Sequence, residues 1–104
     1  MRPIARAVDR ALHALRLDRD VARADAIRAW PEAAAHVLGP DASETRAVRA
    51  DGDTLVVVVP TSHWAGEIRL RERELIAALA AAAPASGITR VRPAPGMAEA
   101  RPAR

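Results

Sequence analysis

The stretch TLVVVVPTSHWAGEIRL, residues 54–70, decides the fold because it passes from a strand into a helix within a few residues. Residues 54–59 are β-branched or aliphatic throughout, which is the strongest strand signal in the chain. Thr61 or Ser62 can then cap the helix that follows. The passage could be a catalytic elbow, a binding surface or a structural corner, and the rest of the sequence has to decide between these.

The remaining elements follow from hydrophobic periodicity and turn residues. The spacing predicts helices over 4–17, 18–38 and 62–83, and strands over 44–50, 54–59 and 88–92. Asp-Gly-Asp at 51–53 supplies a turn, so the first two strands form a hairpin. A right-handed crossover through the long helix makes the last strand parallel to the second. We therefore expect an α+β fold of order α-α-β-β-α-β, with a three-stranded mixed sheet and helices packed on one face.

Two predicted helices contain residues that do not fit a regular helix. Pro31 lacks the backbone donor that a helix interior needs, so we expect a kink or restart near Trp30. In the helix over 62–83, Leu70 points outward while Glu72 falls inside the apolar stripe. A register break around 71–73 would repair both misfits.

Composition and charge limit the function. A chain of 104 residues should form one domain, here 1–92, with a proline-rich disordered tail over 93–104. It has no cysteine and no apolar run of membrane-spanning length, which suggests a reduced, cytoplasmic protein. All sixteen basic residues are arginine, concentrated in two basic ends around an acidic middle. This distribution suits a polyanion such as nucleic acid, although a solvated surface is the alternative for each arginine.

Nothing in the sequence indicates an enzyme. Ser62 and His63 follow a strand, but Ser62 has none of the glycines that a nucleophile elbow needs. The three histidines fall in different elements, without the spacing of metal ligands, and no glycine-rich phosphate loop is present. We therefore expect no cofactor. Trp30 and Trp64 are expected to be mainly core residues, with contact to a partner or a base as the alternative.

The strand, hydroxyl pair and Trp-Ala-x-Glu block resembles the DciA family of bacterial replicative-helicase loaders. The matching residues are Gly52-x-Thr54-Leu55-x-Val57-x-Val59, Thr61-Ser62-x-Trp64-Ala65-x-Glu67-Ile68 and Leu75-Ile76, and the likeness covers roughly 4–92. The resemblance implies a KH-like domain that binds the replicative helicase DnaB and single-stranded DNA and assists helicase loading without nucleotide hydrolysis. Relatives often carry an aromatic residue where this chain has Pro93, so we expect the last strand to be short.

The candidate binding residues follow from charge and exposure. We expect DNA to be held through phosphate contacts of low sequence specificity, by Arg69 and Arg73 on one helix flank and Arg90 and Arg92 on one strand face. Trp64 and Leu70 are the candidates for partner binding. The protein is expected to be a monomer with no membrane contact. The alternative function is a protein–protein adaptor without a nucleic-acid role, using the sheet face of Val56 and Val58 or the edge of the last strand.

Overall fold

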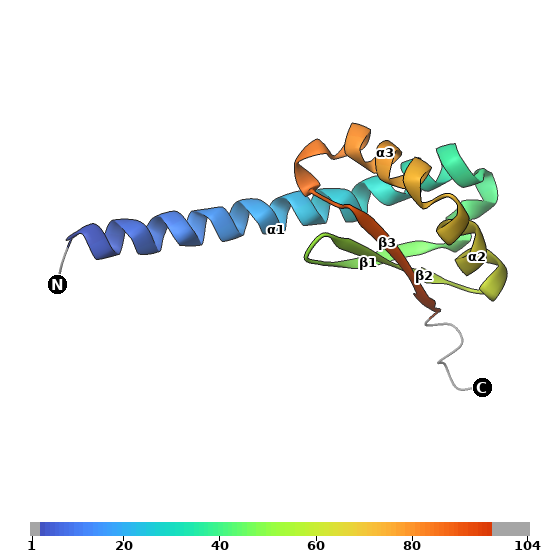
Figure 1. The fold of residues 1–104 in the computed structure, drawn as a ribbon, viewed down its shortest axis with the longest axis horizontal. Helices are drawn as coiled ribbons and strands as arrows, with labels where there is room; N and C mark the ends of the chain where they lie inside the picture. The colour runs from blue at the N-terminus through green and yellow to red at the C-terminus, as the bar shows by residue number, and fades with distance from the viewer. Residues whose placement is uncertain (1–2, 97–104) are drawn as a thin grey trace.

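The computed structural model describes residues 3–96, and it confirms a small α+β domain with three helices and a three-stranded mixed sheet (Figure 1). The elements are α1 (Pro3–Leu38), β1 (Arg46–Asp51), β2 (Thr54–Val59), α2 (Ser62–Leu70), α3 (Glu72–Ala82) and β3 (Arg90–Pro95), with short 3₁₀ helices at Pro40–Glu44 and Pro84–Ser86.

The sheet has the order β1-β2-β3, with β1 antiparallel and β3 parallel to the central β2. Asp51 pairs with Thr54 in the predicted hairpin, and Gly52 takes a positive φ of 63° in the two-residue turn between them. A side chain at that φ would be strained, which is why glycine suits this position. In β2 side chains on both faces of the sheet are buried, Leu55, Val57 and Val59 on one face and Val56 on the other, which accounts for its uninterrupted apolar sequence.

All three helices pack on one face of the sheet, as Figure 1 shows. Leu55, Val57 and Val59 of β2 point into this layer, where α2 and α3 contribute buried leucine and isoleucine side chains. Trp30 of α1 is only 1% exposed and its Nε1 donates a hydrogen bond of 3.0 Å to Thr45 Oγ1. The expectation that Trp30 belongs to the core is confirmed, and its indole N–H is satisfied as a buried polar group should be.

Of the helix interruptions that the sequence predicts, only the break around 71–73 is confirmed. α1 runs without interruption from Pro3 to Leu38, so the predicted division into helices over 4–17 and 18–38 is wrong, and no restart occurs near Trp30. Pro31 lies on the exposed side of α1, where water can hydrate the carbonyl that loses its donor, while the buried side holds the helix together. The predicted break in the long helix is confirmed, because α2 ends at Leu70 and α3 begins at Glu72. The break leaves Leu70 77% exposed.

Strand β3 is longer than expected, since it continues through Pro93 to Pro95. The Val91 N–H donates to Glu72 Oε2 at 2.9 Å and so points away from β2. Residues 93 and 95 share that outward orientation, because alternate residues of a strand present their backbone groups to the same edge. The two prolines therefore remove no hydrogen bond of the sheet, as is usual for proline in edge strands. The rest of the expected tail, 97–104, lies outside the described residues.

Candidate functional site

The face of the sheet opposite the helices carries four exposed arginines. Because Leu55, Val57 and Val59 point into the core, the residues between them point to this open face. The strand register then places Arg46 beside Val58, Arg49 and Arg92 on either side of Val56, and Arg90 beside Thr54. We call Arg46, Arg49, Arg90 and Arg92 the arginine face.

A β-bulge in β1 brings two of these arginines to the same side. The register with β2 shifts between Ala47 and Arg49, which leaves Val48 as the extra residue. Residues three apart in a regular strand point to opposite faces, but Arg46 and Arg49 both oppose open-face valines. Sequence analysis missed both arginines for this reason. The bulge itself leaves no clear signal in the sequence TRAVRAD.

The arginines also change the character of the apolar patch on this face. Val56 is only 1% exposed although it points away from the core. Its neighbours across the sheet are Arg49 and Arg92, and arginine stems commonly cover apolar surface while the guanidinium stays in water. The open face therefore presents guanidinium groups, and the docking surface expected for Val56 is largely covered.

One carboxylate lies among the guanidinium groups. Asp51 Oδ2 is 3.0 Å from Arg49 Nε and 3.9 Å from Arg92 Nη2. Each guanidinium has five N–H donors, so both keep donors that do not face Asp51. Four arginines against Asp51, and against Asp53 at one end, leave the face positive, and the charges are exposed enough to reach an anionic ligand.

At one end of the arginine face, Asp53 ties the hairpin turn to the start of β3. Its carboxylate accepts a hydrogen bond of 2.6 Å from Thr89 Oγ1, and its backbone carbonyl accepts the Thr89 and Arg90 N–H groups. The Thr89 hydrogen bond, aided by the charge of Arg90, holds the pKa of Asp53 below its ordinary value of 3.8. The ionised side chain thus anchors the start of β3, where Arg90 joins the sheet.

Three of the four predicted DNA-binding arginines come together. Arg69, Arg90 and Arg92 line a hollow of about 610 Å³ that also includes Asp51 and Glu72. The hollow extends the arginine face around the β3 edge towards α2.

Arg73 does not line this hollow, and the break at Arg71 places it in α3 while Arg69 belongs to α2. The two therefore do not form the single helix flank that was expected. Arg71, between them, forms ion pairs of 3.6 Å with both Glu67 and Glu74.

The corner between β2 and α2 is structural. Thr61 is the N-cap, as predicted, and its Oγ1 accepts a hydrogen bond of 3.3 Å from the Trp64 N–H. Trp64 is partly buried against the core, with its ring edge-to-face to His63. Leu70 lies about 120° around the helix from Trp64, so the two candidates for partner binding do not share a face.

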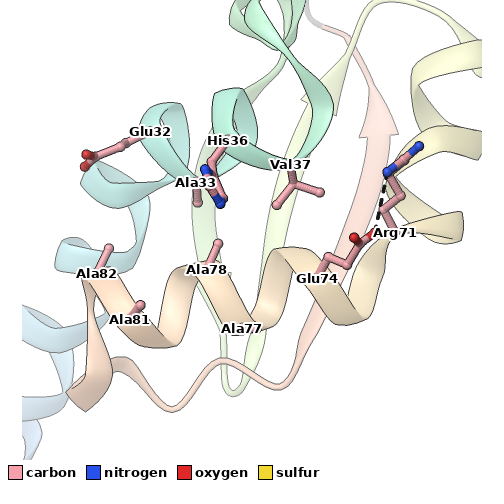
Figure 2. A pocket seen from close by; sticks show the side chains of 10 residues that line it. All are labelled: Glu32, Ala33, His36, Val37, Arg71, Glu74, Ala77, Ala78, Ala81 and Ala82. Atoms are coloured by element: carbon pink, nitrogen blue, oxygen red, sulfur yellow. Dashed lines mark ion pairs between the residues drawn. The ribbon is translucent and has the colours of Figure 1, made fainter.

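A second hollow, of about 910 Å³, lies between the C-terminal part of α1 and α3. Figure 2 shows that alanines line much of it, with Glu32 and His36 on α1 and the Arg71–Glu74 ion pair at one end. Residues 3–96 contain no cluster of three or more potential metal ligands.

Fold and site together define a small α+β domain with a basic sheet face. Residues 3–92 match the family model described as Dna[CI] antecedent, DciA, so the chain belongs to the DciA family. This confirms the resemblance, and it places the chain among proteins with a helicase-loading role in DNA replication. No curated protein matches the chain.

Within the described part of the chain, no helix is long and apolar enough to cross a membrane.

Proposed function

We propose that this chain is a non-enzymatic replication accessory protein of the cytoplasm, which binds the helicase DnaB and single-stranded DNA and assists helicase loading. Family membership supports the helicase as partner. The arginine face, with Arg69 at its edge, is the observation that carries the DNA-binding part of the proposal.

The arginine face suits phosphate groups better than bases. Guanidinium groups bind phosphate oxygens in a bidentate manner, and such contacts carry no sequence information. Base stacking needs exposed aromatic rings, but Trp30 is buried and Trp64 is partly buried. The chain has no other tryptophan, tyrosine or phenylalanine. Binding should therefore be electrostatic, weak at physiological salt and similar for unrelated sequences.

The salt dependence follows from the number of arginines. If the arginine face and Arg69 together contact five phosphates, log K should fall with log salt at a slope of about −3.5, from roughly −0.7 per contact for single strands. This slope corresponds to a loss of about a hundredfold in affinity between about 50 and 200 mM salt.

The alternative function, a protein–protein adaptor, would use the sheet face of Val56 and Val58 or the edge of β3, and neither surface is well suited to docking. The outward backbone donors of β3 are either bound, as at Val91, or missing, as at Pro93 and Pro95. A peptide strand adding to this edge would find no free donor at these positions. Val56, the centre of the other surface, is covered.

The test compares Arg90→Gln/Arg92→Gln with Arg10→Gln/Arg28→Gln in fluorescence anisotropy on two unrelated 20-nucleotide strands. Both double variants lose the same charge, but Arg10 and Arg28 are exposed residues of α1. We expect the first variant to reduce the slope by about 1.4, equally on both strands, and the control to change it little.

A pull-down with DnaB tests the helicase part separately. Both double variants should retain DnaB, because the proposal assigns these arginines to DNA. A strong sequence preference or binding that is indifferent to salt would contradict the phosphate mechanism. Retention of DnaB without any DNA binding would leave an adaptor.

A further inference from the structure

Two arginines lie on the core-facing side of α1 where this helix leaves the domain, next to the β1–β2 hairpin turn (Figure 1). At 3.6 residues per turn, Arg19 and Arg23 share a side of the helix with Ala26 and Trp30, which are 0% and 1% exposed. From Ala26 to Val37 this side is apolar. It therefore changes from a buried apolar surface to a pair of arginines within about one turn.

Both arginines line a hollow of about 320 Å³, which we call the hairpin hollow. Its other walls are Gly52 and Asp53 of the hairpin turn and residues 85–87, which precede β3. Gly52 and Gly87 have positive φ values of 63° and 69°, and outside their chain neighbours no atom lies within 4 Å of the position that a Cβ would take on either. The backbone of both turns is therefore open to close approach by a ligand.

The guanidinium groups of the hairpin hollow are largely unpaired. Among residues 3–96, the Arg19 side chain has no hydrogen-bond or ion-pair partner, and Arg23 reaches only the exposed Asp20, at 3.8 Å. Asp53 also lines the hollow, but its carboxylate accepts a hydrogen bond from Thr89 Oγ1 and forms no ion pair with either arginine in the described part of the chain. Each guanidinium has five N–H donors, so most of these donors are available to an anion.

The hairpin hollow adjoins one end of the arginine face. The strand register sets the four arginines of that face on a diagonal, from Arg46 beside Val58 to Arg90 beside Thr54 at the hairpin end of the sheet. The Arg90 N–H donates to the backbone carbonyl of Asp53 at 3.2 Å, so the last arginine of the diagonal is attached directly to a wall of the hollow. The two basic sites are therefore continuous around the hairpin turn.

We propose that Arg19 and Arg23 bind phosphates of the same DNA strand that lies on the arginine face, after this strand has passed the hairpin turn. The inference rests on the proposed DNA binding and extends its site to α1. A single strand suits the arrangement because its phosphates recur along one chain and can follow a basic path from the sheet to the hollow. Two further phosphate contacts change the salt slope from about −3.5 to about −4.9 for a strand long enough to reach the hollow.

The test compares Arg19→Gln/Arg23→Gln with Arg10→Gln/Arg28→Gln in fluorescence anisotropy on a 20-nucleotide strand. Glutamine keeps the helix propensity of arginine, and Arg10 and Arg28 are exposed on the opposite side of the same helix. We expect the first variant to reduce the salt slope by about 1.4 and the affinity by about ten- to thirtyfold at about 100 mM salt. The control should lose less than about threefold. Both variants should keep the wild-type thermal unfolding and retain DnaB in a pull-down.

A six-nucleotide strand without terminal phosphates tests the path of the DNA. Such a strand has five phosphodiesters, as many as the arginine face and Arg69 have guanidinium groups, so Arg19→Gln/Arg23→Gln should change its slope by less than about 0.5. In amide NMR spectra of the wild type, Gly52 and Gly87 should shift on adding the 20-nucleotide strand and much less on adding the short one. ATP at about 1 mM should leave both signals unchanged, because a free nucleotide cannot also reach the arginine face.

The outcomes separate this inference from the proposed function. If Arg90→Gln/Arg92→Gln weakens binding of the 20-nucleotide strand while Arg19→Gln/Arg23→Gln behaves like its control, the inference is wrong and the proposed function stands. If neither variant weakens binding, the proposed function fails and the inference fails with it. Equal losses for Arg19→Gln/Arg23→Gln on the short and the long strand would overturn the continuous path, and ATP-induced shifts of Gly52 and Gly87 would assign the hollow to a free nucleotide instead.

Discussion

Replacing Asp51 with asparagine should strengthen DNA binding, which is an unusual direction for a substitution in a binding site. Asp51 Oδ2 is 3.0 Å from Arg49 Nε and 3.9 Å from Arg92 Nη2. Phosphate bound by these arginines would displace that interaction and lie close to the carboxylate. Asparagine removes the negative charge, retains the size of the side chain and is well tolerated at a turn.

The magnitude follows from two contributions. A phosphate about 6–7 Å from the carboxylate is repelled by roughly 0.6 kcal/mol in water, and by more near a protein surface. Releasing two exposed ion pairs adds about 0.2–1 kcal/mol for each. The sum is about 1–1.5 kcal/mol after salt screening, so we expect a gain of about five- to tenfold in affinity at low salt.

Fluorescence anisotropy at several salt concentrations measures this gain. Asp25→Asn is the matched control, because Asp25 also pairs with an arginine, Arg28, but on α1. The control should change affinity by less than about twofold. If Asp51→Asn binds no more tightly than wild type, or Asp25→Asn gains equally, the arginine face is not where DNA binds.

The other predictions concern stability and self-association. Trp30→Ala should lower the free energy of unfolding by about 3–5 kcal/mol in denaturant titration, since it empties a buried aromatic site. Trp64→Ala should cost about half as much because Trp64 is partly exposed; an equal loss would contradict the difference in burial. Folding lowers the pKa of Asp53, so the ionised carboxylate stabilises the fold above its unfolded-state pKa of 3.8. This stabilisation is lost as the pH falls through the folded-state pKa. Asp53→Asn should therefore have a lower free energy of unfolding at neutral pH, and this free energy should depend less on pH between about pH 5 and 3. A pH dependence equal to that of the wild type would exclude a stabilising role for the Asp53 carboxylate. Pro93→Val/Pro95→Val should restore two outward donors on β3 and promote self-association in light scattering, with Pro40→Val as control.

Some features were determined by short stretches of sequence. The Asp-Gly-Asp turn, the Thr61 cap and the break near Arg71 each depend on residues within one or two turns, and all three occur as predicted. The residues of the Trp-Ala-x-Glu block were also enough to indicate the family. Local propensity, capping and hydrophobic period act over these distances, so the sequence alone carries them.

Features that depend on distant partners needed the tertiary structure. Pro31 does not interrupt α1, because burial of the neighbouring side holds the helix. Pro93 continues β3, because β3 is an edge strand and its outward donor positions are not needed for pairing. Whether a proline is tolerated depends on which side of its element is exposed, and only packing decides that.

The proposed binding site shows the same division. Arg90 and Arg92 share a face by strand alternation alone, so their grouping was visible in the sequence. Arg46 and Arg49 join them only because a bulge in β1 shifts the register against β2. Arg73 is separated from Arg69 by the end of a helix. The sequence determined which arginines are present, and the pairing of the strands decided which of them lie on the same face.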